Sequence, residues 1–318
     1  MTPAREATAI AHPNIALAKY WGKMDGEGNV PAVPSLSVTL SGMQTKTRVV
    51  FSDALERDAL SLNGREASGE PLVRVSALLD RVRAMAKLRS FAEVESHNDF
   101  PTASGLASSA SGFAALALAA TRAAGLDSSS AAVSELARRS SASAARSVFG
   151  GFVQLEGTAC SVVAPVNQLD LHVLVCVTTE GAKAVGSTSA MNETRTSSPY
   201  YAAWLAEAPR IFGDLRQALL AKNFALVGAL AEKSAFAMHA CALGAGISFF
   251  NQGTLEVLAS VRALRASSVQ AFATMDAGPH VKVLVLESDR ARAERSLVSV
   301  PGVLRVLHTQ PGEGARIL

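Results

Sequence analysis

The sequence predicts an α+β protein, because strand and helix patterns are mixed along the chain without the alternation of a doubly wound parallel sheet. Its 318 residues are 49% hydrophobic and 18% charged, so the chain can form a sizeable core and is not expected to be disordered. No internal repeat or low-complexity linker interrupts it. A change in character along the second half predicts two domains, 1–180 and 181–318.

Local patterns predict the elements of the first half. Asn63–Gly64 is a strong hairpin signal. From Val75 to Val82 the apolar residues recur at the spacing of one helix face. The full set is strands within 35–51, a hairpin over 60–67, a helix over 71–87, a helix after Ser109, a helix over 129–147, a hairpin over 152–164 and a buried strand over 169–178.

The second half is expected to begin with a polar loop, Lys183–Ser198, which is rich in Ser, Thr and Asn. Apolar periodicity then predicts several helices before the chain returns to strands. The expected order is helices near 199–221, 223–241 and 252–265, strands over 268–275 and 280–287, a helix over 288–298 and a strand over 302–309.

Charge and cysteine content exclude several classes of protein. The net charge of +3 is too small to indicate a nucleic-acid partner, and like charges are not clustered. Three scattered cysteines are typical of a reduced protein and do not form a disulfide framework. The N-terminus lacks a signal-peptide core, and no apolar run looks long enough to span a bilayer. We therefore expect a cytoplasmic protein with no membrane partner.

The stretch HNDFPTASGLASSASGFAALALAATRAAG, residues 97–125, is a candidate phosphate site. A loop of small residues around Gly105 leads into an alanine-rich helix whose first residues include Ser108 and Ser109. A helix N-terminus carries free N–H groups and partial positive charge, so it favours an anion. The alternative is that the serines only cap the helix.

Two other segments carry candidate charges. Residues 9–23, AIAHPNIALAKYWGK, place Lys19, Tyr20 and Lys23 close together, which suits an anionic ligand, although a solvated strand end with aromatic packing has the same composition. In TMDAGPH, Asp276 precedes a tight turn between two apolar strands. That carboxylate is either a catalytic base or orienting group, or it simply satisfies backbone N–H groups.

Two arginines are further candidates. Arg146 stands among Ser and Ala in SSASAARS, and its planar guanidinium matches a carboxylate or phosphate in two-point contact. An ion pair with a nearby acid is the structural alternative. Arg74 lies near the start of the helix over 71–87, off its apolar stripe, where a surface arginine is the commoner explanation.

Taken together, these segments resemble the diphosphomevalonate decarboxylase family, a branch of the GHMP kinase superfamily. The resemblance rests on PNIALAKYWGK, PTASGLASSASGFAALA and TMDAGPH, and extends through SASAARSVFGG, KAVGSTSAM, EKSAFAMHACAL and FFNQGT. It implies a ribosomal-S5-like N-terminal domain packed on a ferredoxin-like C-terminal domain, with the site between them. A homodimer is common in the family.

The resemblance also implies a reaction. The family phosphorylates the tertiary 3-hydroxyl of mevalonate 5-diphosphate with ATP and Mg²⁺, then releases phosphate and CO₂ to give isopentenyl diphosphate and ADP. Two anionic ends of one substrate must be held while charge moves between them, which requires fixed cations and hydrogen-bond donors.

By motif, the resemblance assigns roles to individual residues. Asp276 is the catalytic carboxylate, Lys19 the lysine beside it, and Arg146 the group that holds the substrate carboxylate. Ser109 is expected near the transferred phosphate or Mg²⁺. Substrate-binding positions are Tyr20, Lys23, Asn14, Ser143, Arg146, Ser187, Met191 and Arg74. ATP-binding positions are Ser104, Gly105, Leu106, Ala107, Ser108, Ser109 and Lys183.

Three positions depart from the family pattern: His280 replaces Asn, Met275 replaces Phe and Ala190 replaces Gly. Two other functions stay open. One is a relative that accepts mevalonate 5-monophosphate or phosphorylates without decarboxylating. The other is a non-catalytic binding protein on the same scaffold, which the retained set of charged residues argues against.

Overall fold

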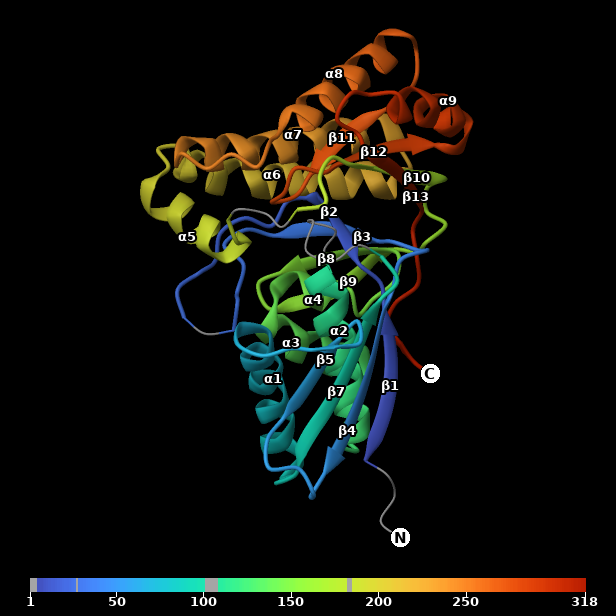
Figure 1. Ribbon diagram of the computed structural model, residues 1–318. Coiled ribbons are helices and arrows are strands. Elements are labelled where there is room, and N and C mark those ends of the chain that lie inside the picture. The colour runs from blue at the N-terminus through green and yellow to red at the C-terminus, as the bar shows by residue number, and fades with distance from the viewer. Residues whose placement is uncertain (1–4, 27, 101–107, 182–184) are drawn as a thin grey trace.

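Among the described residues, three β-sheets with helices packed on them form the framework, which confirms the predicted α+β class (Figure 1). The computed structural model describes residues 5–26, 28–100, 108–181 and 185–318. In the view of Figure 1 the first half of the chain lies below, and helices α6 to α9 lie above it.

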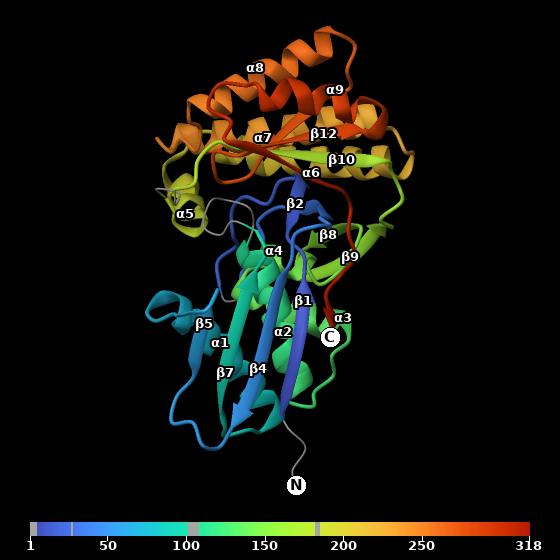
Figure 2. The ribbon, with the colours of Figure 1, turned by 45° about the vertical axis from the view of Figure 1, so that its right-hand side comes forward.

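The first sheet has the strand order β14-β1-β4-β7-β5-β6, in which the β5–β7 pair is parallel and the other described pairs are antiparallel. The long central strands run side by side in Figure 2. The predicted hairpin is confirmed, since Asn63 and Gly64 have φ values of 51° and 75°, the left-handed region that such a turn requires. The strands are β1 (Glu6–Ala11), β4 (Thr45–Ser52), β5 (Ala59–Leu62), β6 (Arg65–Glu66), β7 (Phe91–Asn98) and β14 (Arg316–Ile317).

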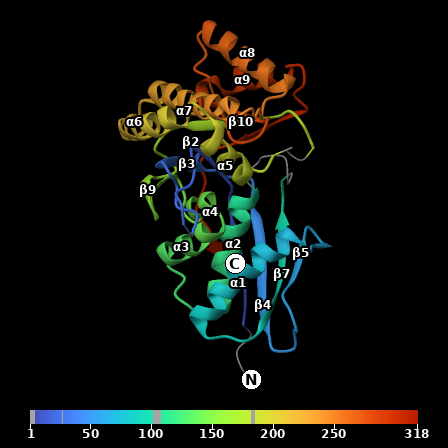
Figure 3. The same cartoon turned by 90° about the vertical axis from the view of Figure 1, so that its left-hand side faces the viewer.

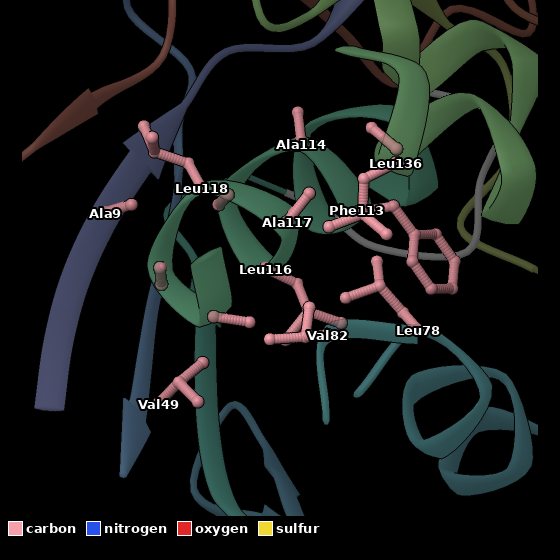
Figure 4. Packing of buried hydrophobic residues seen from close by; sticks show 14 of the residues in the cluster. Ala9, Val49, Leu78, Val82, Phe113, Ala114, Leu116, Ala117, Leu118 and Leu136 are labelled. Carbon is pink, nitrogen blue, oxygen red and sulfur yellow. The ribbon is translucent and has the colours of Figure 1, made fainter. Parts of the chain in front are cut away.

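Helices α1 (Glu70–Ala86) and α2 (Ser108–Ala123) lie against one face of this sheet, and α3 (Ser130–Ser140) packs on both of them, on the same side of the sheet in Figure 3. Figure 4 shows α2 at the centre of the core, where its apolar side chains meet those of the sheet, α1 and α3. The alanines of α2 let its backbone approach the sheet closely.

The expected single helix over 129–147 is instead two helices, α3 and α4 (Ala142–Arg146). They are separated by Ser141, whose backbone is extended at φ −159° and ψ 120°. Serine side chains compete for backbone hydrogen bonds and weaken a helix interior, and Ser140, Ser141 and Ser143 place that weakness here. The break redirects the chain, so α4 carries Arg146 in its own direction.

The second sheet has the order β2-β3-β8-β9 and lies between the first sheet and the upper helices in Figure 1. Every residue of β2 and β3 is buried. The predicted hairpin over 152–164 is confirmed as β8 and β9. The strands are β2 (Asn14–Ala18), β3 (Ser35–Thr39), β8 (Phe152–Glu156) and β9 (Ala159–Ala164).

The third sheet has the order β11-β12-β10-β13 and includes β10, which precedes the predicted domain boundary. Apolar residues on its two faces enter different clusters, one with α6 and α7 and the other mainly with α8 and α9 (Figure 2). Its strands are β10 (Leu171–Val177), β11 (Phe272–Met275), β12 (Val281–Leu286) and β13 (Arg305–Thr309). The helices are α6 (Tyr201–Leu220), α7 (Phe224–Gly244), α8 (Gln252–Ala266) and α9 (Glu287–Val298).

Two expectations for the second half are corrected. The predicted polar loop contains a helix, α5 (Ser187–Ser197), whose Ala190, Met191 and Thr194 are buried. Its few apolar residues pack with Trp21 and Trp204, so tertiary contacts stabilise a helix that its composition does not predict. Helix α7 is long and apolar enough to cross a membrane by length and composition, contrary to the expectation above. Half of that window is buried, and α7 packs against α6, β2 and β11.

The end of the chain returns to the first half. Gly312 N–H donates to the Thr39 carbonyl at 2.8 Å, and Ala315 N–H donates to the Val148 carbonyl at 3.1 Å. β14 then pairs with β1. Gly314 lies against the chain after α4, where an added Cβ would stand 2.7 Å from the Val148 carbonyl oxygen. The C-terminal segment thus secures the segment that follows Arg146.

Candidate active site

Lys19 and Asp276 come from different halves of the chain and form an ion pair. Lys19 follows directly after the buried strand β2. The backbone N–H of Lys19 donates a hydrogen bond to the hydroxyl of Ser234 on α7 at 2.9 Å. Asp276 follows the last residue of β11. Lys19 Nζ lies 2.7 Å from Asp276 Oδ1, with 1% of the Lys19 side chain exposed and 28% of the Asp276 side chain exposed.

A second lysine, which the sequence analysis missed, contacts the same carboxylate. Lys282 Nζ lies 3.0 Å from Asp276 Oδ2, and only 2% of the Lys282 side chain is exposed. Lys282 is a single charge in the apolar strand VKVLVL. The signal was available, because a lysine at a buried strand position needs a partner, and the turn at Asp276 precedes that strand in the sequence.

The pKa values of this cluster reflect burial and mutual charge. Burial lowers the pKa of Lys19 to about 8; the Asp276 carboxylate opposes that shift, whereas the charges of Lys282 and Arg146 reinforce it. Burial alone would raise the pKa of Asp276, but the two ammonium groups outweigh it and hold that pKa well below its ordinary value. Asp276 is therefore an ionised carboxylate engaged on both oxygens.

Arg146 is buried at the end of α4, with 2% of the residue exposed. Its Nε donates to Ser37 Oγ at 3.0 Å, and its Nη1 donates to Ser35 Oγ at 2.7 Å, both from β3. The expected ion-pair alternative is not found among the described residues, because these two partners are neutral hydroxyls. Burial lowers the pKa of Arg146.

The three cations and one carboxylate form what we call the charge cluster, Lys19, Arg146, Asp276 and Lys282. Among the described residues it holds three positive charges and one negative charge, a net formal charge of +2. Buried charge is costly without compensation. The cluster therefore favours an anion beside it.

Asn14 and Ser143 support α4. Asn14 Nδ2 donates to the Ser143 carbonyl at 3.0 Å and to Ser147 Oγ at 2.7 Å. Ser143 and Ser147 lie on either side of Arg146 in the sequence. Asn14 is thus a supporting donor that fixes the direction of Arg146, while the Ser143 hydroxyl lies 3.0 Å from that of Ser141.

Tyr20 and Lys23 follow Lys19 on the same segment. The Tyr20 hydroxyl is buried without a hydrogen-bond partner among the described residues, and burial raises the pKa of that phenol. Lys23 Nζ lies 2.7 Å from Asn29 Oδ1 and 3.3 Å from Thr188 Oγ1. Burial and the nearby charge of Arg74 lower the pKa of Lys23. Both residues offer donors to an anionic ligand.

A cavity of about 370 Å³ opens at the N-terminus of α2, between α1, α2 and the first sheet. Ser108 and Ser109 line it at the start of α2, Phe113 lines it from further along α2, and Arg74 lines it from α1. The Arg74 guanidinium stacks over the Phe113 ring at 4.7 Å. The structure thus places Arg74 in the wall of the cavity that holds the two serines, and within electrostatic reach of Lys23.

The remaining predicted site residues are either partly or fully buried, or lie outside the described residues. Ser187 is half-buried at the first turn of α5, and Met191 is 4% exposed in a cluster with Trp21, Trp204 and Met238. Five predicted ATP-binding positions, Ser104, Gly105, Leu106, Ala107 and Lys183, lie outside the described residues.

The three departures from the family pattern are buried. Met275 and Ala190 enter apolar clusters. His280 Nδ1 accepts a hydrogen bond from Thr178 N–H at 3.2 Å, and burial lowers the pKa of His280 to about 4. A second neutral imidazole, His239 on α7, hydrogen-bonds the Met275 backbone, and burial lowers its pKa to about 3. The sequence analysis did not single out His239.

Both halves of the sequence match described families. Residues 11–161 match the diphosphomevalonate decarboxylase-like N-terminal domain, and residues 173–317 match the mevalonate 5-diphosphate decarboxylase C-terminal domain. The chain is 32% identical to the diphosphomevalonate decarboxylase of Candida albicans, over 97% of this chain and 96% of that protein. It is 34% identical to the phosphomevalonate decarboxylase of Haloferax volcanii, over 92% of each.

Solved structures of decarboxylases of this family have the same fold as this chain. The mevalonate diphosphate decarboxylase of Staphylococcus aureus superposes with a TM-score of 0.94 at 35% identity, over 99% of this chain and 98% of that chain. A structure described as MDDEF in complex with MVAPP, AMPPCP and magnesium gives a TM-score of 0.92 at 37% identity, over 98% of both chains. The predicted GHMP kinase fold is thereby confirmed. By its sequence and by its fold, this chain belongs to the diphosphomevalonate decarboxylase family.

Proposed function

We propose that this protein uses ATP to decarboxylate mevalonate 5-diphosphate, giving isopentenyl diphosphate, ADP, phosphate and CO₂. The observation that carries the proposal is the net positive charge cluster. Its buried Arg146 is held by two serine hydroxyls and not by an acid, and its Asp276 lies between two ammonium groups. A substrate with a carboxylate at one end and phosphate groups at the other supplies the missing negative charge.

The reaction has two stages. The oxygen of the 3-hydroxyl bonds to the γ-phosphorus of ATP, and the bond from that phosphorus to ADP breaks. The hydroxyl proton passes to water, and the phosphate released in the second stage takes up a proton in turn. The C3–O bond then breaks with its electrons on the phosphate. The C1–C2 bond breaks as well, and its electron pair forms the C2=C3 double bond as CO₂ departs. Phosphorylation is needed because hydroxide is a poor leaving group from the tertiary carbon C3, whereas phosphate is a good one.

Each member of the charge cluster has a task in this scheme. Arg146 holds the substrate carboxylate and releases it as CO₂ forms. Lys19 faces the transferring phosphoryl group and stabilises its charge. Asp276 orients Lys19 and the 3-hydroxyl. Because two ammonium groups engage its carboxylate, Asp276 is a weak proton acceptor before substrate arrives, which favours the orienting role over that of a strong base.

The nucleotide is assigned to the cavity at α2. Ser108 and Ser109 offer hydroxyls at a helix N-terminus, which favours phosphate. The described residues contain no group of three or more His, Cys, Asp or Glu side chains that could hold a metal ion. Mg²⁺ fits this arrangement, since it commonly binds through substrate phosphates, waters and few protein oxygens. Ser109 would supply one oxygen, and the ion would neutralise phosphate charge.

The deciding experiment incubates the purified protein with ATP, Mg²⁺ and mevalonate 5-diphosphate, and measures CO₂ and ADP together. We expect equal amounts of both products. ADP without CO₂ would place the protein among kinases that do not decarboxylate. The absence of both products would refute the proposal.

A second candidate substrate is mevalonate 5-monophosphate, favoured by the 34% identity to the Haloferax volcanii phosphomevalonate decarboxylase. Parallel assays with the two mevalonate phosphates distinguish the candidates. We expect a kcat/KM at least tenfold higher for the diphosphate, because Tyr20, Lys23 and Arg74 add donors and charge beyond the charge cluster.

Three further expectations belong to this proposal. The two-domain division 1–180 and 181–318 remains a proposal, and β10 pairs with β12 and β14 pairs with β1 across it. Limited proteolysis near the boundary tests it. A cytoplasmic location accords with three free cysteines, Cys160, Cys176 and Cys241. A homodimer follows the common state of the family, and light scattering of the purified protein tests it.

A further inference from the structure

Lys282 is a charged side chain inside a sheet. Strand β12 lies between β11 and β10, so both of its edges are paired. Lys282 stands opposite Thr274 on β11 and Val175 on β10, and both neighbours are fully buried. An ammonium group at the centre of a sheet is costly to bury, so this lysine has a purpose that an apolar residue would not serve.

The alternation of β12 aims Lys282 at the charge cluster. Val281, Val283 and Val285 enter the apolar cluster with α8 and α9. Leu284 enters the opposite cluster, which contains Leu17 of β2. Successive side chains of a strand point to opposite faces, so Lys282 shares the face of Leu284 and points toward the layer from which Lys19 projects.

Lys282 changes how the Asp276 carboxylate orients and neutralises the Lys19 ammonium group. A carboxylate paired with Lys19 alone would neutralise it and could rotate about its own side chain. With Lys282 on Oδ2 at 3.0 Å, Oδ1 stays directed at Lys19 at 2.7 Å. One negative charge is then shared by two ammonium groups, so positive charge remains at Lys19.

The neighbouring imidazoles do not replace this charge. His239 on α7 and His280 before β12 are both buried, and burial lowers their pKa values to about 3 and about 4. Both are neutral near pH 7. Lys282 is therefore the second cation on Asp276 among the described residues.

We propose that Lys282 is a positioning residue for phosphoryl transfer: it holds Asp276 Oδ2, so that Oδ1 aims the Lys19 ammonium at the transferring group while the charge cluster stays positive. This inference rests on the proposed function. It assigns Lys282 no contact with substrate; its effect passes through Asp276 to Lys19.

The test compares Lys282→Met with Thr274→Val. The methionine keeps the length of the side chain without its charge, and the control alters the opposing buried position on the same face. We expect Lys282→Met to lower kcat about 10- to 100-fold, with the KM for ATP within about threefold of wild type, and Thr274→Val to leave both nearly unchanged. Lys282→Arg, which restores the charge, should recover part of kcat.

The outcomes separate the two proposals. If wild-type protein produces no ADP, the proposed function fails before Lys282 is tested. If wild type is active and folded Lys282→Met keeps kcat within threefold, the inference on Lys282 is overturned. Should Lys282→Met fail to fold, as seen by thermal melting, Lys282→Gln is measured by the same criterion. If neither uncharged variant folds, Lys282 serves folding, and the inference is overturned as well.

Discussion

Lys19 and Asp276 are 257 positions apart in the sequence, yet Nζ of the lysine lies 2.7 Å from Oδ1 of the aspartate. The pair joins β2 of the first half to β11 of the second half. Its geometry exists only when the two halves are packed together. A site that depends on this contact is therefore sensitive to any change that shifts one half against the other.

Replacing Asp276 by Asn should lower kcat about 100-fold or more. The amide keeps the size of the side chain but lacks the charge that orients two ammonium groups. Unfolding free energy should fall by about 2 to 3 kcal/mol, because two buried lysines lose their counter-ion. ATP affinity, measured by titration, should change little, because the assigned nucleotide cavity is lined by other residues.

Asp214→Asn is the control for that substitution, since Asp214 is exposed on α6. It should match wild type in kcat and in urea-unfolding midpoint. An Asp276→Asn protein that is folded and within a few-fold of wild-type kcat would show that another residue is the catalytic carboxylate.

The pH dependence of kcat/KM should report Lys19. Its folded pKa of about 8 lies below the ordinary value of 10.5, so the protein loses the Lys19 proton as pH rises through about 8. Activity needs the ammonium form, so kcat/KM for free enzyme should decline above pH 8, by about tenfold per unit. In the same window the unfolded state holds more protons, so Lys19 makes stability increase between about pH 8 and 10.5.

Lys19→Arg tests this assignment, because a guanidinium stays charged throughout that range. The alkaline decline should move upward or disappear, even though the maximal rate is lower. Lys46→Arg on the exposed part of β4 is the control and should keep the wild-type profile. An unchanged decline in the Lys19→Arg enzyme would assign the titration to a different group.

Arg146→Lys should reduce kcat/KM about 100-fold. A guanidinium can bond two serine hydroxyls and still present its remaining N–H groups to a carboxylate, whereas an ammonium cannot span the same positions. Arg292→Lys on the exposed surface of α9 should have no effect. Near-normal turnover and substrate affinity in Arg146→Lys would mean that the substrate carboxylate is held elsewhere.

Gly112 offers a prediction that separates helix stability from nucleotide affinity. It lies in α2 and lines the cavity, and an added Cβ would meet no atom within 4 Å. Gly112→Ala should stabilise the helix by about 1 kcal/mol. Gly112→Leu should fold but fill part of the cavity and weaken ATP binding at least about tenfold. Calorimetric titration with ATP checks both variants, and equal affinities would place the nucleotide outside this cavity.

Elements with strong local signals were predictable from the sequence. Asn63–Gly64 forms its turn because few other residue pairs adopt two successive positive φ values, and α1 follows the apolar period from Val75 to Val82. Two expectations failed for tertiary reasons. The extended backbone at Ser141 divides a helical pattern, and α5 is stabilised by packing against Trp21 and Trp204.

The site was predictable only where a motif carried it. Lys19, Arg146 and Asp276 stand in recognisable segments, and the structure brings them together. The strand pattern around Lys282 indicates a buried lysine that needs a partner, but its role depends on the direction of its side chain relative to Asp276, six positions earlier. Neither periodicity nor composition contains that direction, because it comes from the pairing of β12 with β11.

The return of residues 312–317 to the first half has a consequence for biosynthesis. The edge of the first sheet beside β1 is closed by β14, and the segment after α4 rests on Gly312 and Ala315. A ribosome makes β1 long before these partners. The nascent first half therefore emerges with an open edge beside β1 and without the C-terminal contacts on the segment after Arg146, so this site can mature only once residues 312–317 have been made.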